Sequence, residues 1–396
     1  MAESYAYREL TGSGPRFWGL IAALGVPLVL AAISFFYIES AGLTVTGMDN
    51  QIVWGAPHVF AVFLLVAATG ALNIAMAASV FGKHAYRRVA PLSALVAIAL
   101  LAAGLAVFML DMGRAERWIV AMTHFNFSSI FAPRTLIYSG FLAIVAVYLW
   151  FMLERRLNDY VKPVAVVAFL AQLFVMTAVA ETFGLNAGRE AYDSALYVPL
   201  FMALGSAYGT AIFTLVLLAA SAWERQSVPE EWLRRLKHLL AVFVGAALFL
   251  GVLLMAAKYH FPRSREVAKY LLFDGGVYPV LFWIGQIALG AIVPLALLVK
   301  CQCSRSAIIA CALVVVGGLA QMYVTLIGGQ AYPQILFPGL LETSSFFDGE
   351  IHPYAPSAAE IGLGLGGLAL AAAIIAIAVR NIAILPARFE RMEPQG

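Results

Sequence analysis

The chain has 396 residues, of which 62% are hydrophobic and only 12% are charged, and its formal net charge is +3. Its mean hydropathy is +0.88. A soluble globular chain of this length does not have such a composition, so the class is a polytopic membrane protein surrounded by membrane lipid. The small net charge gives no sign of a nucleic-acid partner, and none is expected.

Ten apolar runs are long enough to cross a bilayer core of about 30 Å. Lipid offers no partner to an unpaired backbone group, so runs of this length predict helices and an all-α fold. We expect a single integral membrane domain over residues 1–396. Within it, 56–184 and 198–327 are candidates for two four-helix bundles, with peripheral helices at 17–37 and 358–379. The remaining predicted spans are 56–81, 91–110, 134–153, 163–184, 198–222, 238–257, 277–299 and 306–327.

The distribution of basic residues predicts the orientation of these spans. With the N-terminus inside, the inner segments hold 17 of the 25 Lys and Arg residues, and the positive-inside rule then puts both termini in the cytoplasm. No cleaved signal peptide is expected, because the first run reads as a retained helix. The outer connections are longer than the inner ones, which favours a docking or active surface on the outer face.

The segment DNQIVWGAPHVF, residues 49–60, lies where the chain re-enters the membrane. Pro57 suits the first turn of a helix, so His58 is predicted near a helix N-terminus, where the dipole favours negative charge. Trp54 is one helical turn away and can face the same pocket. A titratable imidazole, an indole and a helix start suit a quinone, which takes up electrons and protons. Taken singly, His58 is better interpreted as an interfacial histidine bonded to a backbone carbonyl, and Trp54 as an interface anchor; their spacing of four residues around a helix start is what favours a site.

A second polar group follows where the third span leaves the membrane. Asp111 and Arg114 stand three residues apart, and an ion pair that closes the helix end is as good a reading as a functional one. Hydroxyl and amide groups in an apolar frame suit quinone carbonyl oxygens, although such residues also cap helices. The polar groups that follow Arg114 along the chain are His124, Asn126, Ser128, Ser129 and Tyr138.

Glu181, near the outer end of the fifth span, is a candidate for a proton path together with His124. The alternative is an ion pair of Glu181 with Arg189 or Lys258. Three cysteines cannot make a four-thiolate metal site, and none of the six histidines is in mid-span. The histidine positions therefore argue against a transmembrane di-haem stack and leave a single haem near the outer face as an alternative.

Three segments resemble the NrfD/PsrC family, the membrane subunits of iron–sulfur or molybdenum oxidoreductase complexes. They are VWGAPHVFAVFLLVAATGALN (53–73), LDMGRAERWIVAMTHFNFSSIF (110–131) and NIAILP (381–386). Within the family the chain is most similar to the ten-helix members DsrP, of the sulfur-metabolism DsrMKJOP complex, and HybB. The resemblance implies a bacterial inner-membrane subunit that binds menaquinone or ubiquinone and has no haem or metal of its own. It also implies a periplasmic, ferredoxin-like iron–sulfur partner on the outer face and further subunits of a redox complex.

The resemblance also concerns individual residues. It matches His58 to a family histidine that contacts quinone, and it aligns a family tyrosine loosely with Tyr138. The family asparagine one turn before that histidine has no match here, because Trp54 occupies about its position. The predicted quinone site is therefore His58, Trp54, Asp111, Arg114 and Tyr138. We expect a quinone-reactive subunit of a respiratory or sulfur-metabolising oxidoreductase complex rather than a stand-alone enzyme.

Two alternatives come from other classes. A transporter or proton-translocating channel predicts polar groups at mid-depth and broken helices there, and Gln172, Gln286 and Gln321 are sparse candidates. A purely structural membrane anchor predicts that every ionisable group near His58 is dispensable.

Overall fold

The computed structural model describes residues 7–11, 14–124, 134–301, 303–333, 350–351 and 353–387. Ten helices in these ranges are long and apolar enough to cross a membrane, which confirms the predicted all-α polytopic class. The spans are formed by α1 (Pro15–Ala41), α2 (Ala56–Ala71) with α3 (Asn73–Ser79), α4 (Ala90–Leu110), α6 (Arg134–Leu153), α7 (Val161–Gly184), α8 (Tyr197–Trp223), α9 (Glu230–His260), α11 (Val277–Val280) with the π-helix η6 (Leu281–Ile292) and α12 (Val293–Lys300), α13 (Ser304–Tyr323) with the π-helix η7 (Val324–Gly328) and α14 (Gly329–Ala331), and α15 (Ala358–Asn381).

Short elements connect the spans. They are η1 (Leu43–Val45), η2 (His84–Val89), η3 (Ala115–Arg117), α5 (Trp118–Thr123), η4 (Arg155–Tyr160), α10 (Arg265–Lys269) and η5 (Tyr270–Asp274). The predicted spans agree with the helices to within a few residues, except that α9 begins at Glu230 rather than at 238. Its first two turns are charged and carry an ion pair between Glu231 and Arg235 at 2.9 Å. An apolar-run criterion detects only the part of a helix that lipid surrounds.

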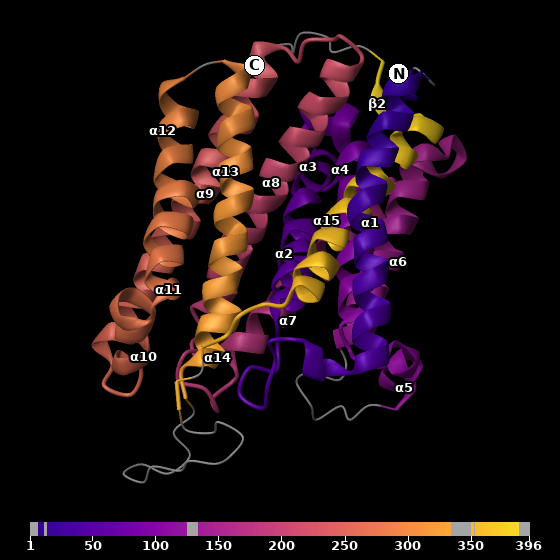
Figure 1. The fold of residues 1–396 in the computed structure, drawn as a ribbon. Coiled ribbons are helices and arrows are strands. Elements are labelled where there is room, and N and C mark those ends of the chain that lie inside the picture. Colours follow the sequence, from indigo (N-terminus) through magenta and orange to yellow (C-terminus); the bar gives the residue numbers. More distant parts are fainter. Residues whose placement is uncertain are drawn as a thin grey trace.

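The first and last described segments meet at one end of the helix array (Figure 1). Strand β1 (Tyr7–Arg8) pairs antiparallel with β2 (Leu385–Pro386). The Arg8 guanidinium lies 3.1 Å from the Glu224 carboxylate at the end of α8, and Thr11 also donates to that carboxylate. We call this the inner end, following the predicted orientation, and the opposite end the outer end.

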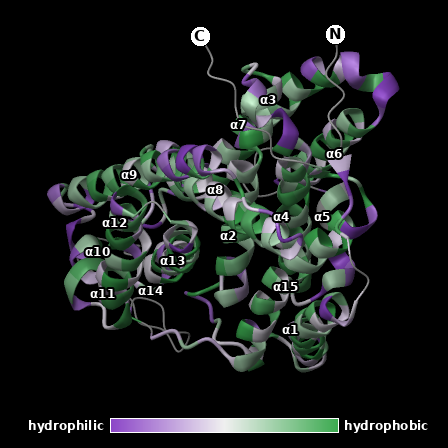
Figure 2. Ribbon diagram, turned by 90° about the horizontal axis from the view of Figure 1, so that it is seen from above, coloured by the Kyte–Doolittle hydropathy of each residue, from purple (hydrophilic) through white to green (hydrophobic). Residues whose placement is uncertain are grey.

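Contacts between helices follow two groups along the chain. We call α2–α3, α4, α6 and α7 the first bundle, and α8, α9, α11–η6–α12 and α13–η7–α14 the second bundle. Helix α2 packs on α4 and α8, α4 on α6, and α6 on α7, whereas α9 and α13 pack on α8, and η6 on α13. Seen from above, most residues of the helices are hydrophobic (Figure 2), as expected of helices that lipid surrounds. The predicted division into two bundles stays a prediction, which these contacts support.

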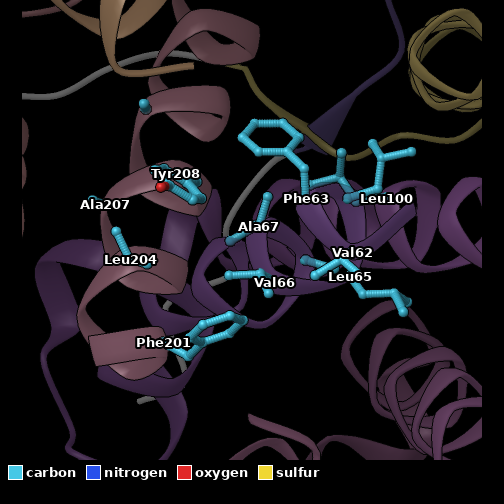
Figure 3. Close-up of a cluster of buried hydrophobic side chains, with 14 of the residues drawn as sticks. Val62, Phe63, Leu65, Val66, Ala67, Leu100, Phe201, Leu204, Ala207 and Tyr208 are labelled. Carbon is cyan, nitrogen blue, oxygen red and sulfur yellow. The ribbon is translucent and has the colours of Figure 1, made fainter. Parts of the chain in front are cut away.

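The two bundles meet where α2 crosses α8. Glycines allow a close approach there: a Cβ on Gly70 would lie 1.6 Å from the Gly205 carbonyl oxygen, and one on Gly209 would lie 2.0 Å from the Ala71 nitrogen. Apolar side chains of the two helices belong to one buried cluster, among them Phe63, Val66 and Tyr208 (Figure 3). The contact of the bundles is therefore backbone against backbone, the packing that small residues permit in membranes.

The last helix, α15, packs between α1 and the first bundle. A Cβ on Gly362 or Gly366 would meet Ser34 or Ala31 of α1, and one on Gly364 would meet Phe60 of α2. The spacing of four residues between Gly362 and Gly366 thus serves helix packing, as a G-x-x-x-G spacing predicts.

A side chain from α4 interrupts the second span between α2 and α3. The Ser93 hydroxyl accepts the Ala75 N–H at 3.0 Å and donates to the Ala71 carbonyl at 2.7 Å. It therefore replaces one helical i to i−4 hydrogen bond, a recognised cause of helix irregularity. The break lies beside a buried polar chain in which Gln172 donates to Asn73, and Asn73 to Ser206.

The crossing of α2 and α8 predicts opposite effects for two glycines of the second bundle. Replacement of Gly209 by Ala puts a methyl group against the α2 backbone and should cost about 3 kcal/mol or more of folding free energy. Gly245→Ala is the matched control, because a Cβ there has nothing within 4 Å; it should be neutral or stabilising by up to about 1 kcal/mol. Thermal unfolding of the purified variants measures both effects, and equal melting temperatures would contradict the close crossing.

The inner end contains an exposed thiol that tests the orientation. Hydrogen bonds from Ser306 to the sulfur lower the pKa of Cys303, which is exposed at the N-cap of α13, so the reactive thiolate is favoured. A membrane-impermeant maleimide should label Cys303 in inside-out vesicles and not in intact spheroplasts. Replacement of both loop cysteines, Cys301→Ser with Cys303→Ser, should remove the label, since Cys301 is half-buried and Cys311 is buried. Labelling in spheroplasts alone would reverse the orientation.

Candidate functional site

Helix α2 starts at the outer end without a side-chain cap of its own. Its N-cap is Gly55, and Pro57 stands in the first turn, so only a few N–H groups there need partners. The Ala56 N–H finds one in the hydroxyl of Tyr354, 2.7 Å away and 298 residues along the chain. His58 is the third residue of this helix, as the sequence predicts.

The His58 ring is bonded to the end of another helix. Its Nδ1 lies 2.5 Å from Oδ2 of Asp111, the residue at the C-cap of α4. A carboxylate at a helix C-terminus faces the negative end of the dipole, and a histidine opposite it offsets that cost. Because the Asp111 carboxylate accepts at Nδ1, that nitrogen carries the proton and Nε2 is left as the exchangeable nitrogen.

The hydrogen-bonding positions that this pair leaves unused point to a ligand. The Asp111 side chain is fully buried, and its second oxygen, Oδ1, has no hydrogen-bond partner in the described part of the protein. The His58 side chain is 21% exposed, and no other residue described by the structure bonds to its Nε2. A buried dyad with one partly exposed nitrogen can exchange a proton with a bound molecule.

Aromatic rings flank the imidazole. The Trp54 indole is nearly parallel to it, with centroids 6.4 Å apart and an angle of 21°. Phe108 meets it edge to face at 5.1 Å. Trp54 is itself held by contacts with Phe183 of α7 and Tyr192. The imidazole therefore lies in an apolar, aromatic frame of the kind that binds flat ring ligands.

The backbone around Trp54 is held by one buried glutamine from the second bundle. Gln330 of α14 is 1% exposed. Its Oε1 accepts the N–H groups of Val53 and Trp54, each at 3.0 Å, and its Nε2 donates to the carbonyls of Trp54 and Leu326. All four hydrogen-bonding positions of the amide are used.

We call the four hydrogen bonds of the Gln330 amide the Gln330 clamp, and neighbouring groups add further hydrogen bonds to it. The Gln330 carbonyl accepts hydrogen bonds from Gln51 and Arg189, and Arg189 also donates to the Gln51 carbonyl. Burial lowers the pKa of Arg189, whereas Tyr192 and Asp49 act in the opposite direction. The extended backbone of residues 51–54 is thus fixed to the loop after α7 and to the second bundle.

On its other side the segment is fixed by the start of α15. Glu360 is fully buried, and its carboxylate accepts the N–H groups of Gly47 and Ser357 at 2.8 Å and the Tyr354 hydroxyl at 2.5 Å. Burial, and next the hydrogen bond to Glu360, raise the pKa of Tyr354, so the phenol keeps its proton as the donor. Gly55 is required here, because a Cβ would lie 2.3 Å from Glu360 Oε1.

The structure brings together only some of the predicted site residues. His58, Trp54 and Asp111 are in contact, whereas Arg114 is exposed; the alternative of an Asp111–Arg114 ion pair is not what the structure has. Tyr138 is buried on α6, and its hydroxyl makes no hydrogen bond to His58.

The two candidates for a proton path differ. Glu181 is half-buried and lies within electrostatic range of Arg134 rather than in a pair with Arg189 or Lys258. His124 is exposed and bonded to its neighbour Thr123. Asn126, Ser128 and Ser129 lie outside the described residues.

Several residues of this site escaped the sequence reasoning. Tyr354, Gln330 and Phe108 were not singled out. Phe108 could not have been found, because one apolar residue in a helix of such residues has no distinguishing signal. The sequence marked Gln330 only weakly, as an amide in an apolar run. It marked Glu360 more clearly, because S-A-A-E at 357–360 is the pattern of a capping box.

The fold and site define an integral membrane protein with a hydrogen-bonded histidine–aspartate pair at its outer end. Comparisons with known proteins place the chain in a family. The model of the family described as "Polysulphide reductase, NrfD" matches residues 44–334, so the chain belongs to the NrfD family.

Three curated relatives carry similar descriptions. The sequence is 22% identical to the "Hdr-like menaquinol oxidoreductase integral membrane subunit" of Archaeoglobus fulgidus, over 96% of this protein and 97% of that one. It is 25% identical to a putative dimethyl sulfoxide reductase membrane subunit of Halobacterium salinarum, over 94% and 93%. It is 24% identical to one of the polysulfide reductase chains of Wolinella succinogenes, over 63% and 83%.

The Gln330 clamp predicts a stability difference between two glutamines. Gln330→Leu leaves two N–H groups and two carbonyls without their partner, so it should lower the free energy of unfolding by about 3 kcal/mol. Gln286→Leu is the control, since the Gln286 amide has no hydrogen bond within the described residues, and it should cost far less. Thermal unfolding in detergent compares them, and a Gln330→Leu protein as stable as Gln286→Leu would show that the clamp is dispensable.

Proposed function

We propose that this chain is the quinone-reactive membrane subunit of a multi-subunit oxidoreductase complex and that its quinone site is at His58. The observation that carries the proposal is the hydrogen bond between His58 Nδ1 and Asp111, which leaves Nε2 available between two aromatic rings. Membership of the NrfD family and the descriptions of the relatives support the same class.

The residues present fit a quinone. Trp54 and Phe108 supply flat apolar surfaces, and the partly exposed His58 supplies one exchangeable nitrogen. A bound quinone supplies the chemistry of taking up or releasing two electrons and two protons. Its headgroup oxygen would accept from, or donate to, His58 Nε2. The nearby start of α2 favours negative charge on that oxygen.

The chain's own part in the reaction is to hold and move a proton. In the neutral ring, Nε2 is an acceptor that can take a proton from a quinol hydroxyl. In the protonated ring, Nε2 is a donor to a quinone oxygen, and the Asp111 carboxylate balances the charge at Nδ1. Asp111 thus orients the imidazole and balances its charge in both directions of the reaction. Glu181, Arg134 and Tyr138 would lie on the proton route or shape the pocket.

The location and partners are part of this proposal. The outer connections, which include residues 111–124 and 185–196, would receive an iron–sulfur subunit close to the His58 end. The complex would lie in a bacterial cytoplasmic membrane, with menaquinone or ubiquinone as substrate. A sulfur compound as the final substrate is supported only by the descriptions of relatives.

Replacement of the dyad tests the proposal in the purified complex. His58→Gln should reduce quinol-dependent turnover roughly 100-fold or more, the range of lost acid–base catalysis. Asp111→Asn should reduce it by a similar factor, since an amide favours the wrong ring tautomer. His260→Gln, at an exposed histidine at the outer end of α9, is the matched control and should leave turnover unchanged.

Two further readouts separate the alternatives. Electron transfer from an artificial donor to the partner subunits should persist in His58→Gln, which shows that the complex is assembled. Extracted quinone should decrease, and no haem spectrum should follow this chain. Normal quinol turnover in an assembled His58→Gln complex would leave a structural anchor as the better interpretation.

A further inference from the structure

Two adjoining cavities lie inside the second bundle, away from His58. The inner of the two lies among α8, α9, η6 and α13, and its polar lining is Tyr208, Gln286 and Gln321. The outer one extends towards Tyr197 and Thr325 and has the same two glutamines in its wall. From Tyr197 to Tyr208 the rise along α8 is about 16 Å, half of a hydrocarbon core of about 30 Å.

The amides in these walls are not satisfied by protein. The Tyr208 hydroxyl donates to Gln321 Oε1 at 3.1 Å. Within the described residues, the Gln321 NH₂ group and the whole Gln286 amide have no hydrogen-bond partner. A polar amide without a partner at this depth costs several kcal/mol, because lipid cannot replace it.

Water can satisfy these amides, because each cavity has a volume of about 20 Å³. A bound water needs about 10–15 Å³ of such space, together with two to four polar partners. The space and the partners coincide at Gln286 and Gln321. We therefore propose that the second bundle holds bound water at Gln286 and Gln321, about one molecule in each of the two cavities that lie between Tyr197 at the outer end and Tyr208 at mid-depth.

The helix geometry supports a permanent space at this place. The walls contain two π-helical segments: η6, which carries Gln286 and lines both cavities, and η7, which carries Thr325 and lines the outer one. A π-helix widens the turn and is frequent at functional sites. Beside it, Gly290 and Gly317 bring η6 and α13 into backbone contact, since a Cβ on Gly317 would lie 2.1 Å from Gly290 Cα. The helices are thus fixed against each other and cannot close the cavity by moving inward.

The charge of the lining limits what the cavity takes. Its described side chains are neutral, and the nearest cation is Lys258, whose Nζ lies 5.7 Å above the Tyr197 ring at the outer mouth. A metal cation would meet like charge at the mouth and no carboxylate inside. The ligand is therefore water, and the site is distinct from the His58 dyad of the first bundle.

Hydroxyl-radical footprinting with an X-ray pulse tests this proposal on the complex in lipid nanodiscs. Radicals formed from a bound water oxidise the side chains next to it. Met255 and Tyr208 line the cavities and should be oxidised at least 5-fold faster than Met202, which is similarly half-buried but lines neither cavity, and than the buried Met322.

The double variant Gln286→Leu and Gln321→Leu adds the causal test. It should reduce oxidation of Met255 and Tyr208 to the level of Met202, while quinol turnover at His58 shows that the fold is intact. Oxidation of Met255 and Tyr208 at the Met202 level in the unaltered complex would overturn the proposal, whether or not the variant folds. Unchanged oxidation in a folded double variant would also overturn it.

Discussion

The structure depends on how one irregular stretch of backbone, residues 47–56, is satisfied at the edge of the membrane. Extended backbone cannot be left unpaired where lipid replaces water. Here the partners are side chains from distant parts of the chain: Gln330 from the second bundle, Tyr354 just before the last helix, Glu360 in its first turn, and Arg189 from the loop after α7. Position and orientation of Trp54 and His58 follow from these bonds.

Two helix ends of opposite polarity create the chemistry beside that stretch. The start of α2 carries a histidine and the end of α4 carries an aspartate, each the less favoured charge type for its helix terminus. Their contact offsets both costs and leaves one nitrogen for proton exchange. A site of this kind needs no charged residue deep in the membrane, and the mid-span regions of the first bundle use neutral groups such as Asn73, Gln172 and Ser93 instead.

Buried polar groups in the second bundle are handled in two ways. At the ends of α9, Lys237 and Lys258 donate to backbone carbonyls of Cys301 and Tyr192 and pin the helix to the connections beside it. At mid-depth, the glutamine amides face a cavity rather than protein. The outer cavity reaches Gly329, the residue before Gln330, so the hydrated space and the segment that holds Trp54 are neighbours along the same helix.

The sequence by itself determined the membrane class, the ten spans and the place of His58 at a helix start. These properties depend on local patterns: the length of apolar runs, a proline in a first turn and the balance of basic residues. Helix α9 is longer than predicted, because its first turns are charged and nevertheless helical. The resemblance to the NrfD family also rested on local motifs, and the family model bears it out.

Only the tertiary structure decided which polar groups meet. Asp111 is 53 residues from His58 and had Arg114 as a nearer candidate, yet the packing of α2 on α4 selected the histidine and left Arg114 exposed. Gln330 lies 276 residues from Trp54, and Tyr354 lies 298 residues from Ala56. Such contacts arise from the packing of whole helices on one another, and periodicity along one helix contains no information about which distant side chain will face it.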